Sequence, residues 1–291
     1  MGLFEQLQDL MIKYHFRPEK KMSQFFCINE ALLVFLANSA KIEKNDVVLE
    51  IGPGTGFLTR LLLNKAKKTG AKIVAAELSE DLVEVLTQEF ATDISSGDLK
   101  LIQGDALNLD FESLGITKIV SLPPYHISSD LVSKIAMTNG LTRVILILDR
   151  GFVEKLLAFE GLSEYVALTV LITLNSKVEV LEGNISSQSF FPPPNCQSAA
   201  VQFDFDVKNN SKEFFTFLRE LFRHKNKDLS RSLKQAFPFL SKELGWKEKD
   251  FDKKCVGLKI SGKKVYLLSP KEFLEVFTLL SGAKTISSKK K

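Results

Sequence analysis

Cysteine, histidine and tryptophan are scarce in this chain of 291 residues, which holds 3 Cys, 3 His and 1 Trp. The cysteines, Cys27, Cys196 and Cys255, form neither a Cys-x-x-Cys pair nor an even set, which argues against a disulfide framework and a thiolate metal centre. We expect reduced and mostly buried thiols. Because no metal-binding motif includes His126 or His224, we assign no metal site.

Long apolar runs are also absent. No segment approaches the ~18 consecutive apolar residues of a membrane span, and the most apolar stretch, Val166–Leu174, is expected to be a buried helix or strand. The first residues, Met1–Gln6, include an acid and lack the basic head and apolar core of a signal peptide. We therefore expect a cytoplasmic protein without a membrane partner, long enough for two domains.

Glycine, by contrast, is concentrated in one informative segment. In Val47–Gly56 a run of strand-forming residues is followed by Gly52, Gly54 and Gly56, and then by the helix-periodic segment Phe57–Leu63. Alternating glycines turn the chain sharply and let the backbone approach a ligand. The spacing differs from the dinucleotide fingerprint, and no Lys-Ser/Thr pair follows the loop. NAD and a phosphate-binding loop are therefore disfavoured.

Acidic residues follow the next two predicted strands. Glu77 lies near the end of Lys72–Leu78, and Asp105 follows Leu99–Gln103. The Glu77 carboxylate can accept hydrogen bonds from both hydroxyls of a ribose. Asp105 stands at a strand end, where open α/β sheets bind ligands, and can accept from an adenine amine. These features favour an adenosine cofactor without phosphates, S-adenosylmethionine; in the alternative interpretation the glycines only turn the chain and Glu77 is a surface carboxylate.

A fourth predicted strand, Lys118–Leu122, runs into Pro123, Pro124 and Tyr125. Two prolines make a stiff turn, which holds the tyrosine ring beside the same crevice. We predict that Tyr125 stacks on a flat base. The alternative is a rigid turn capped by a buried ring.

The spacing of the predicted strands defines the fold class. Strands recur at intervals of about 25 residues, which is typical of βαβ units and a parallel sheet. They are predicted at Val47–Glu50, Lys72–Leu78, Leu99–Gln103, Lys118–Leu122 and Arg143–Leu148, and Ser176–Leu181 and Ala199–Phe205 close the sheet. We predict an α/β fold with a Rossmann-like methyltransferase sheet in residues 1–205 and a small α-helical domain in residues 206–291.

The chain resembles a known family, the small-subunit ribosomal RNA adenine dimethyltransferases, over nearly its whole length. Ser23–Cys27 is similar to the family's Gly-Gln-Asn/His-Phe-Leu, Phe190–Ala199 to its Phe-x-Pro-x-Pro-Lys-Val-Asp-Ser-Ala, and Arg223–Lys227 to its Arg-His/Arg-Arg-Asn-Lys. The resemblance implies methyl transfer from S-adenosylmethionine to adenine amines. The cofactor-binding residues that it implies are Gln24, Phe25, Cys27, Gly52, Gly54, Gly56, Glu77, Asp105 and Leu122.

The resemblance also implies how a flipped base would be held. The base would lie against Tyr125, its amine held by the turn at Leu122, Pro123 and Pro124, with Phe190 supporting its far face. The alternative for Phe190 is a plug in the core.

One position of this turn departs from the family, which has Asn where this chain has Leu122. In the family, that Asn side chain and a backbone carbonyl hold the hydrogens of the target amine. Leucine accepts no hydrogen bond, so only the Pro123 carbonyl and Ser121 remain. Two alternatives therefore stay open: a ribosome-assembly RNA-binding factor with weak or lost activity, and a methyltransferase acting on large-subunit rRNA or DNA.

Charge is distributed unevenly along the chain. From Asp206 onward there are 21 Lys and Arg against 10 Asp and Glu, a net charge of +11, which leaves −7 for residues 1–205. A basic appended domain can neutralise phosphates and steer RNA to an acidic domain. A predicted helix over Glu213–Phe237 would place its cations on one face, unless that face is only solvated. The predicted RNA-binding residues are Arg219, Arg223, Lys225, Lys227, Arg231 and Lys234. The predicted partner is small-subunit rRNA within a pre-ribosomal particle, bound by a monomer.

Overall fold

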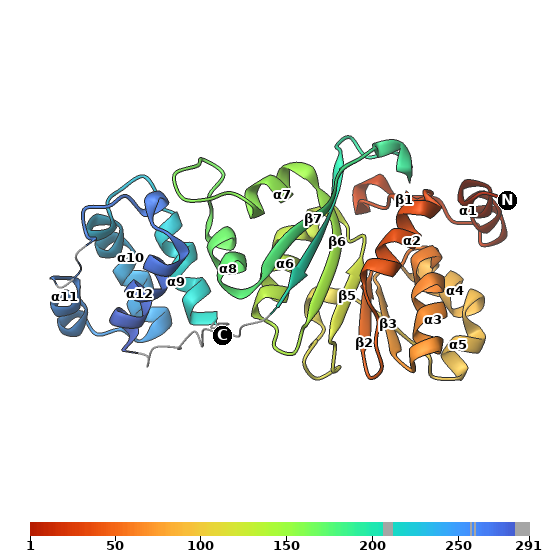
Figure 1. Cartoon of the computed structure of the whole chain (residues 1–291), viewed down its shortest axis with the longest axis horizontal. Coiled ribbons are helices and arrows are strands. Elements are labelled where there is room, and N and C mark those ends of the chain that lie inside the picture. The colour runs from red at the N-terminus through yellow and green to blue at the C-terminus, as the bar shows by residue number, and fades with distance from the viewer. Residues whose placement is uncertain (206–211, 257, 259, 283–291) are drawn as a thin grey trace. The chain divides into compact units, whose positions relative to one another are not determined.

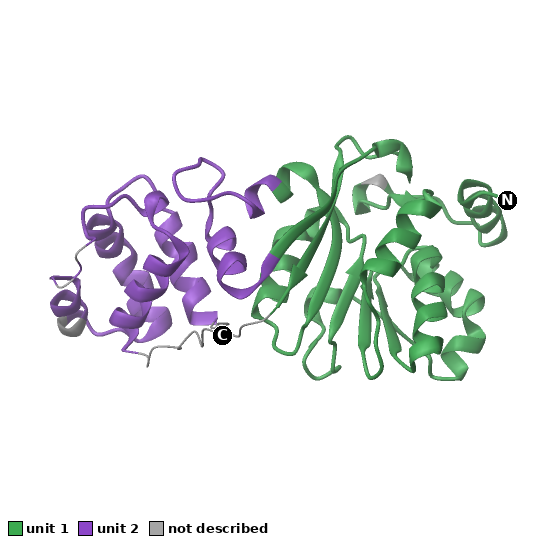
Figure 2. Ribbon diagram, in the orientation of Figure 1, with its two compact units in different colours: residues 1–153, 178–205 green, residues 154–177, 206–291 purple. Residues whose placement is uncertain are grey.

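The computed structural model describes residues 1–205, 212–256, 258 and 260–282 (Figure 1). The chain divides into two compact units (Figure 2): residues 1–153 and 178–205 form unit 1, and residues 154–177 and 206–291 form unit 2. Unit 1 thus ends at residue 205, and the segment 154–177 groups with the C-terminal residues. None of the helices in the described ranges has both the length and the apolar character needed to cross a bilayer.

A seven-stranded sheet in the order β4-β3-β2-β5-β6-β9-β7 forms the centre of unit 1. The strands are β2 (Val47–Ile51), β3 (Lys72–Glu77), β4 (Leu99–Gln103), β5 (Lys118–Ser121), β6 (Arg143–Asp149), β7 (Lys177–Ile185) and β9 (Ser198–Asp204). Strands β4, β3, β2, β5 and β6 pair in parallel, and β9 pairs with β6 antiparallel. This mostly parallel sheet confirms the predicted fold class. Because parallel strands share one direction, the ends of β2 to β5 lie at one edge, where the predicted site residues follow.

Helices cover the sheet of unit 1 because its strands are apolar on both faces. Val144–Leu148 of β6, for example, are all fully buried. The helices of this unit are α1 (Leu3–Lys13), α2 (Glu30–Ser39), α3 (Phe57–Thr69), α4 (Glu80–Glu89), α5 (Ala91–Ser95), α6 (Ser128–Met137) and the start of α7 (Arg150–Leu156). Helix α3 begins directly after the glycine loop and ends at Gly70, whose φ of 81° provides its C-cap.

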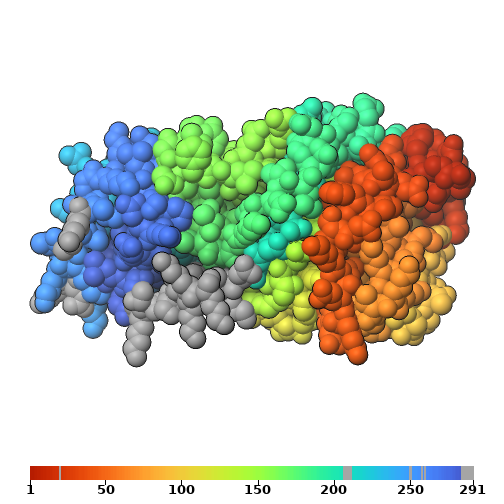
Figure 3. Space-filling model, in the orientation of Figure 1, coloured from red at the N-terminus to blue at the C-terminus, as the bar shows by residue number. Residues whose placement is uncertain are grey.

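A small second sheet joins two segments that are far apart in the sequence. Strand β1 (Phe26–Cys27) pairs antiparallel with β8 (Phe190–Phe191), with Phe26 opposite Phe191 and Cys27 opposite Phe190. The N-terminal segment (red) also lies beside the segment that contains β8 (green) on the surface drawn in Figure 3. The pairing fixes the Ser23–Cys27 segment over the edge of the main sheet.

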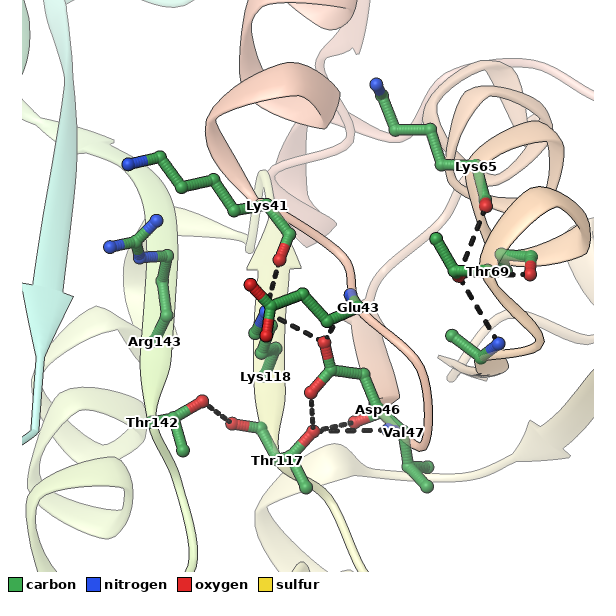
Figure 4. Close-up of polar contacts among 12 residues, drawn as sticks. Lys41, Glu43, Asp46, Val47, Lys65, Thr69, Thr117, Lys118, Thr142 and Arg143 are labelled. Atoms are coloured by element: carbon green, nitrogen blue, oxygen red, sulfur yellow. Dashed lines mark hydrogen bonds and ion pairs between the residues drawn. The ribbon is translucent and has the colours of Figure 1, made fainter.

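The opposite end of the sheet is tied together by buried polar contacts (Figure 4). Lys118 at the start of β5 is 7% exposed; its ammonium donates to the backbone oxygen of Lys41 and lies 2.7 Å from Asp46 Oδ2. Asp46 also accepts from the Thr117 hydroxyl at 2.8 Å. Burial raises the pKa of Asp46, but the hydrogen bonds from Lys118, Glu43 N and Thr117 outweigh it and leave that pKa lowered. An ion pair held in this way fixes β2 against β5.

Unit 2 is helical in its described residues. Its helices are α8 (Ala167–Asn175), α9 (Lys212–Phe222), α10 (Leu229–Leu244), α11 (Glu248–Val256) and α12 (Pro270–Ser281). Helix α8 is the buried element predicted for Val166–Leu174. Aromatic rings fill the core between α9 and α12: Phe217 lies 5.4 Å from Phe277, and Phe222 lies 5.3 Å from Phe273, between ring centroids.

The single helix predicted over Glu213–Phe237 is wrong. The chain leaves the helical conformation after Phe222, and α10 begins only at Leu229. Asp228 starts the second helix, because its Oδ1 accepts from the backbone nitrogen of Arg231 at 3.0 Å. An Asp directly before an apolar residue is a helix N-terminus signal that can be read from the sequence. The prediction followed the periodicity of the charges instead and overlooked this signal.

Candidate active site

A cavity of about 170 Å³ lies in unit 1 at the ends of β2, β3, β4 and β5. Its lining includes seven of the nine predicted cofactor residues, namely Gln24, Phe25, Gly52, Gly54, Glu77, Asp105 and Leu122. A smaller cavity beside it is lined by Cys27, Glu50 and several of the same residues. Of the predicted cofactor residues, Gly56 alone lines neither cavity. The fold therefore brings together residues from five separate segments of the sequence.

The glycine loop has a backbone conformation that residues with a side chain rarely adopt. Gly52, Gly54 and Gly56 have φ values of 63°, 60° and 82°. A Cβ on Gly54 would lie 3.0 Å from the Phe26 ring, so this glycine lets the N-terminal segment approach the loop. A Cβ on Gly56 would lie 2.3 Å from Phe90 Cε2. Gly56 therefore serves the packing of α3 against the end of α4.

We predict that Gly56→Ala lowers the free energy of unfolding by about 2–5 kcal/mol, the sum of left-handed strain and overpacking against Phe90. Gly97→Ala is the matched control, because Gly97 has a similar φ of 74° but nothing within 4 Å of an added Cβ. Gly97→Ala should lower the free energy of unfolding only by the left-handed strain, about 1–2 kcal/mol. Urea unfolding of both variants measures the difference, and equal losses would show that Phe90 yields.

Glu77 is a buried acceptor at the centre of the cavity. It is 6% exposed. Its Oε2 accepts from Gly54 N at 3.1 Å, and its Oε1 accepts from Leu78 N at 2.9 Å and Ser79 N at 3.0 Å. Burial raises the pKa of Glu77, although these three N–H groups favour the charged form. Since a carboxylate offers four acceptor positions, the side chain both anchors the glycine loop and retains capacity for a ligand hydroxyl.

A second carboxyl group, that of Glu50, lies deeper. It is 1% exposed, and its Oε2 accepts from the Thr59 hydroxyl at 2.6 Å. Burial, reinforced by the charge of Glu77, raises the pKa of Glu50 to about 8 despite the hydrogen bond from Thr59. Glu50 is therefore largely protonated at neutral pH, and Glu77 is the one of the two that lines the larger cavity.

Asp105 lines the same cavity from the end of β4. Its Oδ1 accepts from Leu107 N at 2.8 Å and so caps the short 3-10 helix Ala106–Asn108. Among the described residues, no other hydrogen bond to this carboxylate is found. The second oxygen remains available to a ligand amine.

At the end of β5 the cavity wall is apolar. Leu122 lines both cavities, and Pro124 lines the larger one. From the sequence, the Ser121 hydroxyl was a second candidate acceptor for a substrate amine. Ser121 is 1% exposed, and its hydroxyl donates to Ile51 O at 2.5 Å. Because Ser121 is buried and lines neither cavity, the acceptors that the turn offers a ligand are its backbone carbonyls, including that of Pro123.

The N-terminal segment crosses over this turn. Ser23 has a φ of 53°, and its Oγ lies 3.2 Å from His126 Nδ1. Gln24 Oε1 accepts from Glu19 N at 2.8 Å. The Phe25 ring lies 6.0 Å from the Tyr125 ring, tilted by 33°. The segment therefore closes the cavity with an aromatic ring rather than with the polar group of the family pattern.

Tyr125 and Phe190 line neither cavity. Tyr125 shares a 2.5 Å hydrogen bond with Ser198 Oγ, and burial raises the pKa of its hydroxyl to about 12. Phe190 is 3% exposed and packs in the core next to Cys27, so contact with a base would require it to become exposed. Burial also raises the pKa of the Cys27 thiol to about 11. Sequence reasoning did not single out Ser198, although it lies in the motif Phe190–Ala199.

In unit 2 the six predicted RNA-binding residues surround the α9–α10 turn. Arg219 lies on α9, Arg223, Lys225 and Lys227 lie in the turn, and Arg231 and Lys234 lie on α10. Four of them have partners: Arg223 pairs with Glu220 at 3.0 Å, Arg231 with Asp228 at 3.4 Å, Lys225 donates to Ser163 O, and Lys227 donates to Gln235 Oε1. All six except the half-buried Lys225 are exposed. The cations thus form a cluster around a turn and not a stripe along one helix.

Comparisons with known proteins show which sequences and which fold this chain is similar to. A family model described as "Ribosomal RNA adenine dimethylase" matches residues 15–275. The chain is 33% identical to "Probable ribosomal RNA small subunit methyltransferase A" of Methanopyrus kandleri over 80% of this chain and 82% of the relative, and 29% identical to the protein of the same name in Thermococcus gammatolerans over 98% and 97%. A dimethyladenosine transferase from Plasmodium falciparum has a similar fold, with a TM-score of 0.71, 24% identity and coverage of 88% of this chain and 98% of that one.

Proposed function

This chain belongs to the ribosomal RNA adenine dimethylase family, and from this premise we propose that it transfers methyl groups from S-adenosylmethionine to the exocyclic amines of adenines in small-subunit ribosomal RNA. The observation that carries the proposal is the cavity in which Glu77, Asp105 and the glycine loop meet Leu122 and Pro124 of the turn after β5. The relatives of this chain are named as small-subunit rRNA methyltransferases, which supports the substrate class.

The residues of the cavity fit the proposed cofactor. Gly52 and Gly54 line the cavity without side chains, at φ values of 63° and 60°, so a ligand can approach their backbone. Glu77 keeps one acceptor position for a ribose hydroxyl, and Asp105 offers one for an adenine amine. Gln24, Phe25 and Cys27 would cover the cofactor, with Leu122 beside its reactive end. When bound, S-adenosylmethionine supplies a methyl group that its sulfonium activates for transfer.

The turn after β5 would orient the substrate base. Tyr125 provides a flat surface for an adenine taken out of its stack. The Pro123 carbonyl accepts a hydrogen of the target amine, so the nitrogen lone pair is directed toward the cofactor. The proton leaves after transfer, and therefore positioning, with no strong base, carries the rate. Phe190 would support this arrangement from behind β1.

The basic residues of unit 2 would hold the RNA backbone. We expect Arg223→Ala and Lys227→Ala each to weaken RNA binding for all sequences and to lower the slope of log affinity against log salt by about 1. Filter binding at several salt concentrations measures this. Lys242→Ala, an exposed lysine further along α10, is the matched control. If the slope of log affinity against log salt were equal for all three variants, the RNA would bind at a surface other than the one around Arg223 and Lys227.

We further propose that the protein acts in the cytoplasm, as a monomer, on RNA within a pre-ribosomal particle. The proposed function is tested by incubating the protein with labelled S-adenosylmethionine and either small-subunit or large-subunit particles that lack methylation. Label in small-subunit rRNA supports the proposal. Label confined to large-subunit rRNA would assign the protein a different substrate.

A further inference from the structure

We propose that Ser198 is a positioning residue for methyl transfer, which holds the ring of Tyr125 at the angle that the substrate base requires. The inference rests on the proposed function, in which Tyr125 is the surface against which the base lies. It adds a residue of β9 to this site.

Ser198 is fixed more firmly than the turn that it contacts. It is the first residue of β9, is fully buried, and lies opposite Asp149 in the antiparallel pairing with β6. Its backbone is thus anchored in the main sheet. The Ser198 hydroxyl lies 2.5 Å from the Tyr125 hydroxyl, and it makes no other hydrogen bond among the residues that the structure describes.

The contact acts on the far end of the tyrosine ring. Tyr125 stands on the turn after Pro124, where the backbone fixes only the near end of the side chain. The hydrogen bond at the hydroxyl fixes the other end, and the centroid of the Phe25 ring lies 6.0 Å from that of Tyr125, with the two rings tilted by 33°. The pKa of the Tyr125 hydroxyl is raised to about 12 by burial, so the group stays protonated and the bond persists throughout the neutral range.

A tilted ring would misdirect the base without loosening the cofactor. The rate of methyl transfer depends steeply on the alignment of the attacking nitrogen, and a tilted Tyr125 ring would change that alignment. Binding of the cofactor should not change, because Ser198 lines neither of the two cavities that the predicted cofactor residues line. Loss of the Ser198 hydroxyl should therefore lower kcat and leave the affinity for S-adenosylmethionine unchanged. If Ser198 only fills space at the strand end, kcat will not depend on whether Tyr125 has its hydroxyl.

A double-mutant cycle separates these roles. Ser198→Ala and Tyr125→Phe are each expected to lower kcat about 10-fold, the effect of one lost buried hydrogen bond. The double variant should also lose about 10-fold, because both changes break the same contact, whereas independent effects would multiply to about 100-fold and overturn the proposal. Ser128→Ala is the control, since Ser128 is also buried and its hydroxyl has no partner among the described residues.

Fluorine NMR tests the contact without relying on activity. The chain has only 4 tyrosines, so 3-fluorotyrosine labelling gives few signals, and Tyr125→Phe assigns the one from position 125. Ser198→Ala should shift that signal and leave the other three in place; an unmoved Tyr125 signal would overturn the proposal. If the unaltered protein forms no methylated adenosine, the proposed function is wrong, and Ser198 has no role in methyl transfer. The NMR signal still shows in that case whether Ser198 holds the Tyr125 ring.

Discussion

Glu77→Gln is expected to lower the affinity for S-adenosylmethionine by about 100-fold. A hydrogen bond to a charged group contributes about 1.5–3 kcal/mol, and this carboxylate, which accepts three backbone N–H bonds, keeps one acceptor position for a ribose hydroxyl. Glutamine keeps the shape but has one acceptor oxygen, and its amide would face Gly54 N, which now donates to Oε2. The variant therefore loses both a ligand contact and an anchor of the glycine loop. Isothermal titration of the cofactor measures the loss.

The control for this prediction is Glu80→Gln, an exposed acidic residue on the first turn of α4. It should bind the cofactor as the unaltered protein does. Because burial raises the pKa of Glu77, the affinity of the unaltered protein should also fall as pH is lowered through that raised value. Equal affinities for Glu77→Gln and the unaltered protein would remove Glu77 from the cofactor site.

Leu122→Asn is expected to raise kcat for methyl transfer by about 10–100-fold. The wall of the cavity at Leu122 is apolar, and the Ser121 hydroxyl is buried outside the cavity, so Leu122 and Ser121 offer no side-chain acceptor to the target amine. A side-chain oxygen at position 122 would stabilise the charge that develops on the amine, and a single group aimed at such charge is worth about 100-fold or more in other enzymes. Single-turnover methylation of small-subunit particles measures the gain.

Leu122→Met is the matched variant, because it keeps the volume and adds no acceptor for the amine; it should not exceed the rate of the unaltered protein. A Leu122→Asn variant that is no faster would show that the backbone carbonyls of the turn suffice. If only Leu122→Asn formed product, the unaltered chain would be an RNA-binding factor that has lost its chemistry at one position.

Much of the lining of the cavity could be predicted because its residues are local signals at strand ends. The glycine loop, Glu77 and Asp105 each follow a strand-forming run, and a parallel sheet brings such ends together. The contact between Gly56 and Phe90 was not predicted, since Phe90 lies 34 positions along and no local pattern marks it. The structure adds this packing role, and the cofactor-binding role of Gly56 stays a prediction.

Contacts between distant segments were the least predictable. Tyr125 and Ser198 are 73 residues apart, and Phe190 became a core residue because β8 pairs with β1. In unit 2 the charge periodicity over Arg219–Lys234 indicated one helix, although the Asp228 cap divides it. Charge spacing constrains a helix weakly, because exposed cations gain little from lying on one face, whereas a cap satisfies backbone groups directly.

The central claim is most directly tested by the identity of the product. The unaltered protein is incubated with S-adenosylmethionine and small-subunit particles that lack methylation, and the rRNA is then digested to nucleosides and analysed by mass spectrometry. We expect adenosine methylated on its exocyclic amine. Cofactor binding without any methylated adenosine, or methyl groups found only on other nucleosides, would contradict it.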